Sequence, residues 1–335
     1  MDTVRRLYAN TSAQVRKGKL LTEEFRTTGG VIQGCPLSPH LFNLYLEWVM
    51  RMALGNYEGG IEIGGIKISN LRYADDIVLV AESKEELQRV VRLLEEQCIK
   101  YGLVINKDKT KSMKIGRQRE VLDIQLTEGE VEQVSEFKYL GVYFTEDGKL
   151  ERAIKDRIST GQKAFGRLGR IWKDRNVSRK LKVRLFRAIV IPTVLYGAEC
   201  WVLKKREERK LAAFEMKCLR RICGVRWEDR LTNSRVREMA DVEDTILTRV
   251  EDIQRRWFGH VQRMEFDRWP KRVLHERVAG NRPRGRPRGS WMKRLKNNNE
   301  GETVQQLTHM ELDRDVGRKW QHHMQGPTQR EPDGT

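Results

Sequence analysis

Two adjacent carboxylates interrupt an apolar, β-rich stretch of the sequence. Asp75 and Asp76 stand between Tyr73-Ala74 and Ile77-Val-Leu-Val80. A tight turn between two strand halves would let both carboxylates reach one side, although neighbours along a strand point to opposite faces. Such oxygen ligands suit Mg²⁺, which takes few protein carboxylates together with substrate phosphates. The pair therefore indicates a metal site for nucleotidyl transfer, with two cations about 3.5–4 Å apart. The alternative is an ordinary Asp-containing hairpin turn.

The strands around this pair predict an α+β fold for the first part of the chain. β-rich segments with turn signals predict hairpins at 13–27, 61–68 and 137–144, and short strands are expected around 103–105 and 112–115. The apolar stretch that contains the two aspartates adds a further pair of strand halves.

Two helices complete this part. Ser38 is expected to cap a helix over about 39–54. Ser83 and Glu86 have the spacing of a capping box, and apolar residues then recur every 3.6 positions until Gly102, which predicts the stop of that helix.

Beyond Lys149 the pattern becomes basic and helical. Four stretches have helical periodicity, at 150–172, 178–190, 204–222 and about 244–263, and a short helix is expected to begin at Trp291. The predicted domains are an α+β part at 1–148, a mostly α-helical region at 149–265, and a basic Arg/Pro-rich segment with a flexible tail at 266–335.

The positive charge is concentrated in the second part. The 335 residues have a formal net charge of +18, yet the first 150 contain 21 basic and 22 acidic side chains. The excess therefore lies entirely in residues 151–335. A basic half predicts a polyanionic partner, most simply nucleic acid; the alternative is a surface that serves only solubility.

Composition excludes several classes of protein. A hydrophobic share of 39% is sufficient for a packed core. No apolar run approaches the roughly 18 residues of a membrane helix, and no apolar segment follows Arg5-Arg6 as in a signal peptide. Five cysteines in a chain this long argue against a disulfide scaffold and for a reducing, intracellular setting. A secreted or membrane protein is not expected.

Four short motifs follow one another in the first part. They are Gly30-Val-Ile-Gln-Gly-Cys-Pro-Leu-Ser-Pro39 with Leu41-Phe-Asn43, Tyr73-Ala-Asp-Asp76, Gly102-Leu-Val-Ile-Asn106 with Lys109-Thr-Lys111, and Phe137-Lys-Tyr-Leu-Gly141. In this order they resemble the palm motifs of reverse transcriptases, including the catalytic hairpin and the primer-grip segment. Further motifs extend the resemblance to about Lys296, namely Tyr196-Gly-Ala-Glu199, Phe214-Glu-Met216 and Arg256-Trp-Phe-Gly-His-Val261. These resemble the post-palm region of non-LTR (LINE-type) retrotransposon enzymes of the endonuclease–reverse transcriptase kind. The resemblance implies that 1–148 is a partial reverse-transcriptase palm and that 149–265 is a thumb and post-thumb region.

The resemblance implies an RNA-directed DNA polymerase that uses Mg²⁺ or Mn²⁺ in two-metal nucleotidyl transfer. Its partners would be an RNA template, a DNA primer or target, and dNTPs. Asp75 and Asp76 would be two of three metal-binding aspartates. Gln33 and Gly34 would lie beside the incoming nucleotide and template. Lys109 would lie near the triphosphate, where a cation neutralises the leaving pyrophosphate.

The resemblance also places the primer. Tyr139, Leu140 and Gly141 would support the primer terminus. The alternatives for the other residues remain open: Gly34 could serve only a turn, and Lys109 could be a surface lysine. Ile32 and His40 stand where the family often has Arg and an apolar residue.

The family's third aspartate lies on a strand upstream of 13–27. Before Gln33 the acidic residues are Asp2, Glu23 and Glu24, and none fits the family's arrangement. We therefore expect an N-terminally truncated chain with little polymerase activity, because two cations on two carboxylates would be under-neutralised. An unpaired sheet edge and exposed apolar surface are also expected. The alternatives to an enzyme are a non-catalytic nucleic-acid-binding remnant and a decayed fragment.

Basic residues recur along the first helix of the second part. They are Lys155, Arg157, Lys163, Arg167 and Arg170. We expect them to contact the phosphates of a template–primer duplex; the alternative is a solvated helix face.

The Arg282-Pro-Arg-Gly-Arg-Pro-Arg288 run resembles an AT-hook core. Arg284 and Arg286 would enter a narrow A·T minor groove. The alternative is a flexible basic linker that can also act as a nuclear-import signal, and a nuclear location is expected.

The cysteines of the second part could bind zinc or could be buried free thiols. Cys200, Cys218 and Cys223 are expected to be buried free thiols, because the Cys-x₂-Cys spacing of a zinc site is absent.

Overall fold

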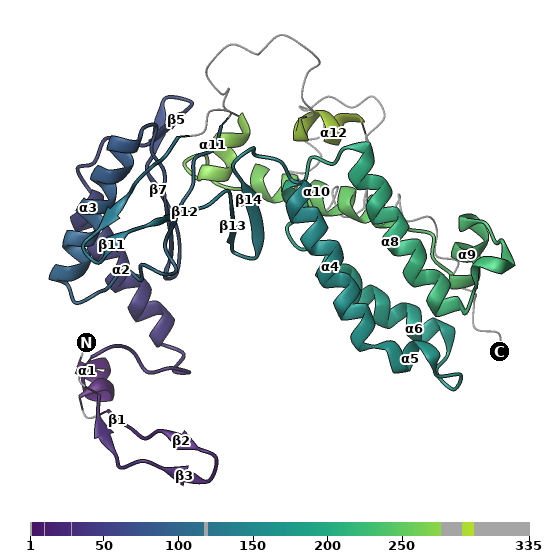
Figure 1. Cartoon of the computed structure of the whole chain (residues 1–335), viewed down its shortest axis with the longest axis horizontal. Coiled ribbons are helices and arrows are strands. Elements are labelled where there is room, and N and C mark those ends of the chain that lie inside the picture. Colours follow the sequence, from purple (N-terminus) through teal and green to yellow (C-terminus); the bar gives the residue numbers. More distant parts are fainter. Residues whose placement is uncertain (1, 10, 28, 117–119, 276–289, 298–335) are drawn as a thin grey trace. The chain divides into compact units, whose positions relative to one another are not determined.

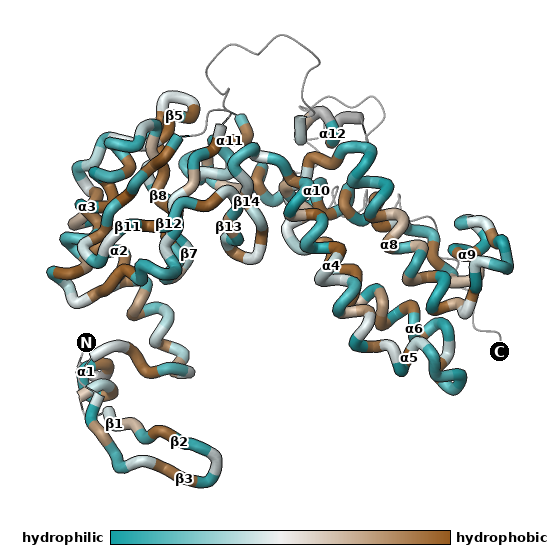
Figure 2. Tube along the Cα trace, in the orientation of Figure 1, coloured by the Kyte–Doolittle hydropathy of each residue, from teal (hydrophilic) through white to brown (hydrophobic). Residues whose placement is uncertain are grey.

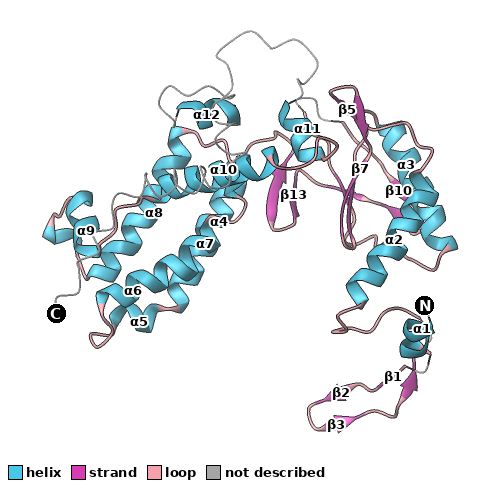
Figure 3. Ribbon diagram, turned by 180° about the vertical axis from the view of Figure 1, so that it is seen from behind, coloured by secondary structure: helices cyan, strands magenta, loops and turns pink. Residues whose placement is uncertain are grey.

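The computed structural model describes residues 2–9, 11–27, 29–116, 120–275 and 290–297 (Figure 1). They belong to two compact units. The first comprises Met1–Thr110 and Ile124–Val131, and the second comprises Lys111–Asp123 and Glu132–Thr335. Helices and strands mix in the first unit, whereas helices dominate the second (Figure 3). This mixture agrees with the predicted α+β class.

The first unit contains short paired strands and two long helices. Its elements are α1 (Asp2–Tyr8), β1 (Ser12–Ala13), β2 (Arg16–Lys17), β3 (Leu20–Leu21), β4 (Phe25–Arg26), α2 (Ser38–Leu54), β5 (Ile61–Ile63), β6 (Ile66–Ile68), β7 (Asn70–Tyr73), β8 (Asp76–Leu79), α3 (Lys84–Lys100), β10 (Gln125–Leu126) and β11 (Gly129–Glu130). The antiparallel pairs are β1–β4, β2–β3, β5–β6, β7–β8 and β10–β11.

The second unit begins with strands and continues as helices. Its elements are β9 (Lys111–Ser112), β12 (Glu132–Gln133), β13 (Glu136–Tyr139), β14 (Val142–Thr145), α4 (Glu151–Arg167), α5 (Gly169–Lys173), α6 (Arg179–Leu185), η1 (Phe186–Val190), α7 (Ile191–Val194), η2 (Ala198–Cys200), α8 (Lys205–Cys223), η3 (Trp227–Asp229), α9 (Asn233–Ala240), α10 (Ile246–Gln262), α11 (Trp269–His275) and α12 (Trp291–Asn297). β9 and β12 pair in parallel, and β13 and β14 pair antiparallel.

The core of the first unit lies between α2 and α3. Val49 and Met50 of α2 and Val90 and Leu94 of α3 are buried together, and Ile77 of β8 packs against them. One face of the β7–β8 hairpin is therefore fixed to the two helices. Apolar residues alternate with polar ones along both helices (Figure 2), as expected for helices with one buried face.

Two expectations about helix starts in this unit need correction. Leu37, and not Ser38, occupies the N-cap position of α2, and no side chain caps that helix. Ser83 does cap α3 and accepts the N–H of Glu86 at 3.1 Å. However, the Glu86 carboxylate accepts the N–H groups of Glu82 and Gly60, so it fixes the neighbouring loop instead of closing a capping box.

The strand expected at 103–105 is absent, although three apolar residues follow one another there. Leu103 and Ile105 pack against the helical core, whereas Val104 is 78% exposed. Gly102 has a left-handed φ of 68°, and the Leu103 N–H donates to the Cys98 carbonyl, which ends α3 as predicted. The segment therefore alternates in burial without pairing to a strand. The strand expected at 112–115 is reduced to Ser112 within β9.

Apolar surface is exposed in the first unit, as expected. Leu20 is 75% exposed, Leu44 on α2 is 70% exposed, and Tyr73 on β7 is 66% exposed. Among the described residues, β7 and β8 pair only with each other. Both outer edges of this hairpin therefore offer unpaired backbone groups.

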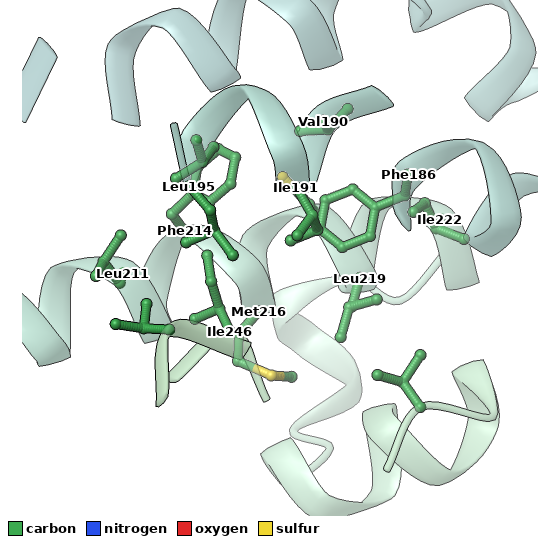
Figure 4. Close-up of a cluster of buried hydrophobic side chains, with 14 of the residues drawn as sticks. Phe186, Val190, Ile191, Leu195, Leu211, Phe214, Met216, Leu219, Ile222 and Ile246 are labelled. Carbon is green, nitrogen blue, oxygen red and sulfur yellow. The ribbon is translucent and has the colours of Figure 1, made fainter. Parts of the chain in front are cut away.

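The core of the second unit is formed by helices that the sequence predicts. Side chains of η1 and α7, including Phe186 and Ile191, meet those of α8, including Phe214 and Leu219 (Figure 4). α6, η1 and α7 follow one another directly, with a π-helical turn just before Pro192. Proline lacks an N–H and crowds the preceding turn, so a widened turn accommodates it without ending the helix.

Candidate active site and nucleic-acid interface

The two aspartates lie at the tip of the β7–β8 hairpin. Tyr73 pairs with Asp76, which leaves Ala74 and Asp75 as a two-residue turn. Ala74 has a φ of 52°, in the left-handed region that such turns use. The predicted tight turn between two strand halves is therefore confirmed.

Both carboxylates are exposed. Within the described parts of the chain, no hydrogen bond or ion pair is found for either. Arg72 on the same hairpin does not pair with these aspartates. Its Nη1 lies 2.6 Å from Oε2 of Glu47 on α2. Two oxygen-donor side chains are thus available to a hard cation. No group of three or more His, Cys, Asp or Glu that could hold a metal occurs in the described ranges.

Gln33 and Gly34 form the centre of a turn before α2. The Cys35 N–H donates to the Ile32 carbonyl at 3.2 Å, and Gly34 has a φ of 86°. A turn with a positive φ at its third position favours glycine. The structural role of Gly34 is therefore confirmed, while its contact with a nucleotide stays a prediction.

This turn is anchored to the start of α2. The buried Ser38 hydroxyl donates to the Ile32 carbonyl and shares a 3.0 Å hydrogen bond with the Tyr8 hydroxyl. The side chain that was expected to cap the helix thus holds the preceding loop.

Lys109 lies in a turn that Asn106 organises. The Asn106 side-chain oxygen accepts the Lys109 N–H at 3.0 Å, and its carbonyl accepts the Thr110 N–H and hydroxyl. The Lys109 ammonium is exposed and has no ion pair with a described residue. No direct hydrogen bond links Lys109, the Gln33 turn and the aspartates across the described part of the first unit.

The predicted primer-grip segment is the β13–β14 hairpin. Tyr139 pairs with Val142, and Leu140 and Gly141 form the turn with φ values of 46° and 78°. The Tyr196 hydroxyl donates to the Leu140 carbonyl at 2.9 Å, and the Arg157 guanidinium donates to the Gly141 carbonyl. The hairpin is thereby attached to the helices of the second unit.

Arg157 does not belong to the exposed basic face of α4, contrary to the sequence-based expectation. Its side chain is only 12% exposed, and its guanidinium also lies 5.0 Å from the centre of the Tyr196 ring. The helix turns this residue toward the hairpin because Arg157 lies on the inner side of α4, three positions after the buried Ile154.

The other four basic residues of this segment are exposed. They are Lys155, Lys163, Arg167 and Arg170. The first three recur at helical spacing on one face of α4, and none of the four has an ion pair with a described residue. This face presents uncompensated cations to solvent, as a phosphate-binding surface would.

The remaining predictions concern the cysteines, the Arg/Pro-rich run and the absence of a membrane helix. All five cysteines are free; Cys218 is buried, Cys223 is half-buried and Cys200 is exposed, so the expectation of a buried thiol is wrong for Cys200. Arg284 and Arg286 lie outside the described residues. No described helix is long and apolar enough to cross a membrane.

Sequence reasoning missed one residue that holds the β13–β14 turn, Tyr196, and one that holds the segment after it, Gln254. Tyr196 stood in a family-like motif without an assigned role, and Gln254 was not singled out. The Gln254 side chain donates to the carbonyls of Ala198 and Trp201 at 3.1 and 2.7 Å. A polar residue on the apolar face of a predicted helix was the signal that was available.

Comparison with known proteins relates the chain to reverse transcriptases and to retrotransposon polyproteins. Residues 2–144 match the family model described as reverse transcriptase (RNA-dependent DNA polymerase). The chain is 30% identical over 187 residues to the Retrovirus-related Pol polyprotein from type-2 retrotransposable element R2DM of Drosophila melanogaster, and the match covers 49% of the chain and 18% of that protein. It is 32% identical over 160 residues to the Retrovirus-related Pol polyprotein from type-1 retrotransposable element R2 of Bradysia coprophila, and the match covers 44% of the chain and 18% of that protein.

A shorter relative is similar over more of its length. A transposon-derived protein of Caenorhabditis elegans is 27% identical over 219 residues, which cover 62% of the chain and 77% of that protein. The match thus takes in most of this relative but less than a fifth of each of the two R2 polyproteins named above.

Proposed function

We propose that the chain is the palm and thumb part of a LINE-type RNA-directed DNA polymerase, because residues 2–144 match the reverse transcriptase family model and the chain is similar to Pol polyproteins of R2 retrotransposable elements. The observation that carries the proposal is the tight turn at Ala74-Asp75 with two exposed, unpaired carboxylates. An ordinary Asp-containing turn would more often use its carboxylates to bond its own backbone.

The donor set fits a hard divalent cation. Asp75 and Asp76 would hold Mg²⁺ or Mn²⁺, and the bound cations would supply charge neutralisation at the reacting phosphate. Their exposure leaves room for the phosphates that complete the coordination of such ions. Gln33 and Gly34 would contact the incoming dNTP and template through the exposed turn before α2, and the Lys109 ammonium would neutralise the triphosphate.

The second unit would hold the nucleic acid. Lys163 and Arg167, together with Lys155 and Arg170, would contact the phosphates of an RNA template paired to a DNA primer. Tyr139, Leu140 and Gly141 would support the primer terminus. Arg284 and Arg286 would add A·T minor-groove contacts, and a nuclear location would follow from a DNA target.

One observation favours a second function for these 335 residues taken alone. Asp2, Glu23 and Glu24 are the acidic residues before Gln33, and none precedes the 13–27 hairpin on a strand of the described part. Two carboxylates neutralise two divalent cations poorly, so this polypeptide would bind nucleic acid without efficient catalysis. The domain assignment of 1–148, 149–265 and 266–335 is part of the same proposal.

A primer-extension and binding experiment tests both functions. The 335-residue protein is incubated with an RNA template annealed to a labelled DNA primer, dNTPs, and Mg²⁺ or Mn²⁺. We expect salt-sensitive binding and only background extension. Extension that Asp76→Asn abolishes would overturn the non-catalytic function and support the enzyme. Absence of binding at low salt would leave a decayed fragment as the better explanation.

A further inference from the structure

We propose that Arg157 and Tyr196 are positioning residues for the primer terminus, because together they fix the backbone of the Leu140–Gly141 turn. The inference rests on the proposed function, in which this turn supports the primer. It assigns to a residue of α4 and to a residue of the turn between α7 and η2 a role that neither performs by touching nucleic acid.

The contacts on the turn are complementary. Leu140 and Gly141 both have left-handed φ values, and both of their carbonyls accept hydrogen bonds from side chains outside the hairpin. Tyr196 donates to one carbonyl at 2.9 Å, and Arg157 donates to the other. The guanidinium also lies over the Tyr196 ring at 5.0 Å, so each donor restricts the other.

Gly141 fits this arrangement closely. A Cβ built there would lie 3.4 Å from Cε1 of Tyr196 and 3.6 Å from Nη2 of Arg157. The two side chains thus pack directly on the backbone of the turn. A glycine is favoured here by its φ of 78° as well as by this close approach.

The segment that follows Tyr196 is fixed by contacts with α10. Gly197 has a φ of 80° and turns the chain into η2, and the buried Gln254 of α10 donates to the Ala198 carbonyl at 3.1 Å and to the Trp201 carbonyl at 2.7 Å. Because Gln254 is only 1% exposed, this support belongs to the helical core. The segment that follows Tyr196 is thereby anchored to the core of the second unit, and the Tyr196 hydroxyl connects that segment to the turn.

The compensated charge and the low exposure of Arg157 distinguish its positioning role from phosphate binding. Arg157 is 12% exposed and lies 3.6 Å from the Asp156 carboxylate, which compensates part of its charge. Lys163 on the same helix is exposed and has no such partner among the described residues. Arg157 should therefore affect where the primer end lies, whereas Lys163 should affect how tightly the duplex binds.

The test uses the full chain and a duplex with a recessed primer end. The primer carries 2-aminopurine at its 3′-terminal position or, in a second duplex, six base pairs inward. Binding affinity and its salt dependence are measured by anisotropy, and the saturating fluorescence change reports the environment of each probe. The variants are Tyr196→Phe, Arg157→Lys and Lys163→Ala. Tyr143→Phe is the matched control. It removes a hydroxyl from the same hairpin, and this hydroxyl makes no hydrogen bond to a described residue.

We expect Tyr196→Phe and Arg157→Lys to reduce the terminal-probe change at least twofold, with affinity altered less than twofold and the inward probe unchanged. Amide hydrogen exchange at residues 139–142 should accelerate in the same variants. Lys163→Ala should instead weaken affinity and leave the saturating terminal change intact. If both variants retain the fluorescence change that the wild type gives at the 3′-terminal probe, the inference is overturned and the proposed function is not affected. A wild-type protein that gives no terminal change would overturn the primer-contacting part of the proposed function and the inference with it.

Discussion

Nη2 of Arg237 lies 2.6 Å from Oε2 of Glu215 and joins α9 to the interior face of α8. Glu215 is 2% exposed and is flanked by the buried Phe214 and Met216. A charge removed from water to this degree requires a partner. The Phe214-Glu-Met216 motif of the sequence therefore contributes packing and one buried ion pair, without direct chemistry.

Removal of one partner of this pair should be strongly destabilising. Arg237→Leu leaves an uncompensated carboxylate in the core, and we expect a loss of about 3–5 kcal/mol in the free energy of unfolding. The double variant with Glu215→Leu should lose clearly less than the sum of the two single variants. Urea unfolding followed by circular dichroism measures the cycle, and additive single effects would contradict a coupled pair.

Gly161 sets the approach of α4 to α7. A Cβ at this position would lie 2.1 Å from Cγ2 of Val194 and 3.2 Å from Cζ of Phe214. Both neighbours are buried, so Gly161→Ala should destabilise the second unit by about 1–3 kcal/mol. Gly166→Ala on the same helix meets no atom within 4 Å and should stabilise by about 0.4–1 kcal/mol. Thermal melts of the two variants should therefore shift in opposite directions.

Glu86 should make the stability of the first unit depend on pH. Burial opposes its ionisation, but the N–H groups of Glu82 and Gly60 and the Tyr57 hydroxyl hold its pKa below the ordinary value. Because the folded pKa is depressed, this stabilisation is complete above the unfolded pKa of about 4.3 and is lost as pH falls through the folded pKa.

Glu86→Gln should accordingly cost about 1 kcal/mol at neutral pH and flatten the acid limb of the stability profile. Glu85→Gln is the control, since that carboxylate lies in the same helical turn and is exposed. Urea midpoints measured from pH 3 to 7 make the comparison. Equal acid limbs for the wild type and Glu86→Gln would contradict the role of these hydrogen bonds.

Local patterns predicted most elements of this fold, and long-range contacts account for the errors. Ser83 and Gly102 bounded α3 correctly because caps and left-handed stops depend on neighbouring residues. The Ser38 cap failed because its hydroxyl bonds a loop carbonyl and the Tyr8 side chain, 30 residues earlier. Arg157 was misplaced for a similar reason, since its partner is a turn backbone that charge patterns do not reveal.

Cys35, which follows the Gln33-Gly34 turn, should react faster with alkylating agents than the buried Cys98 and Cys218. The Leu37 N–H lowers the pKa of its thiol and burial opposes this only in part, whereas burial raises the pKa of Cys218 to about 12. Since the thiolate is the nucleophile, alkylation at Cys35 should precede that at Cys218 by a wide margin. Peptide mass spectrometry after timed iodoacetamide treatment at pH 7.5 measures both, with Cys98, whose pKa burial also raises, as a slow control. Faster modification of Cys218 than of Cys35 would contradict this order.

The exposed basic face of α4 should control the salt dependence of nucleic-acid binding. Each phosphate contact releases about one counterion, so Lys163→Ala or Arg167→Ala should reduce the slope of log K against log salt by about 1. Lys205→Ala is a charge-matched control, because that ammonium lies 3.1 Å from the Glu208 carboxylate and is already compensated. Anisotropy titrations from 50 to 200 mM salt provide the slopes. If Lys205→Ala changes the slope as much as Lys163→Ala does, binding follows net charge, and the α4 face is not the phosphate-binding surface.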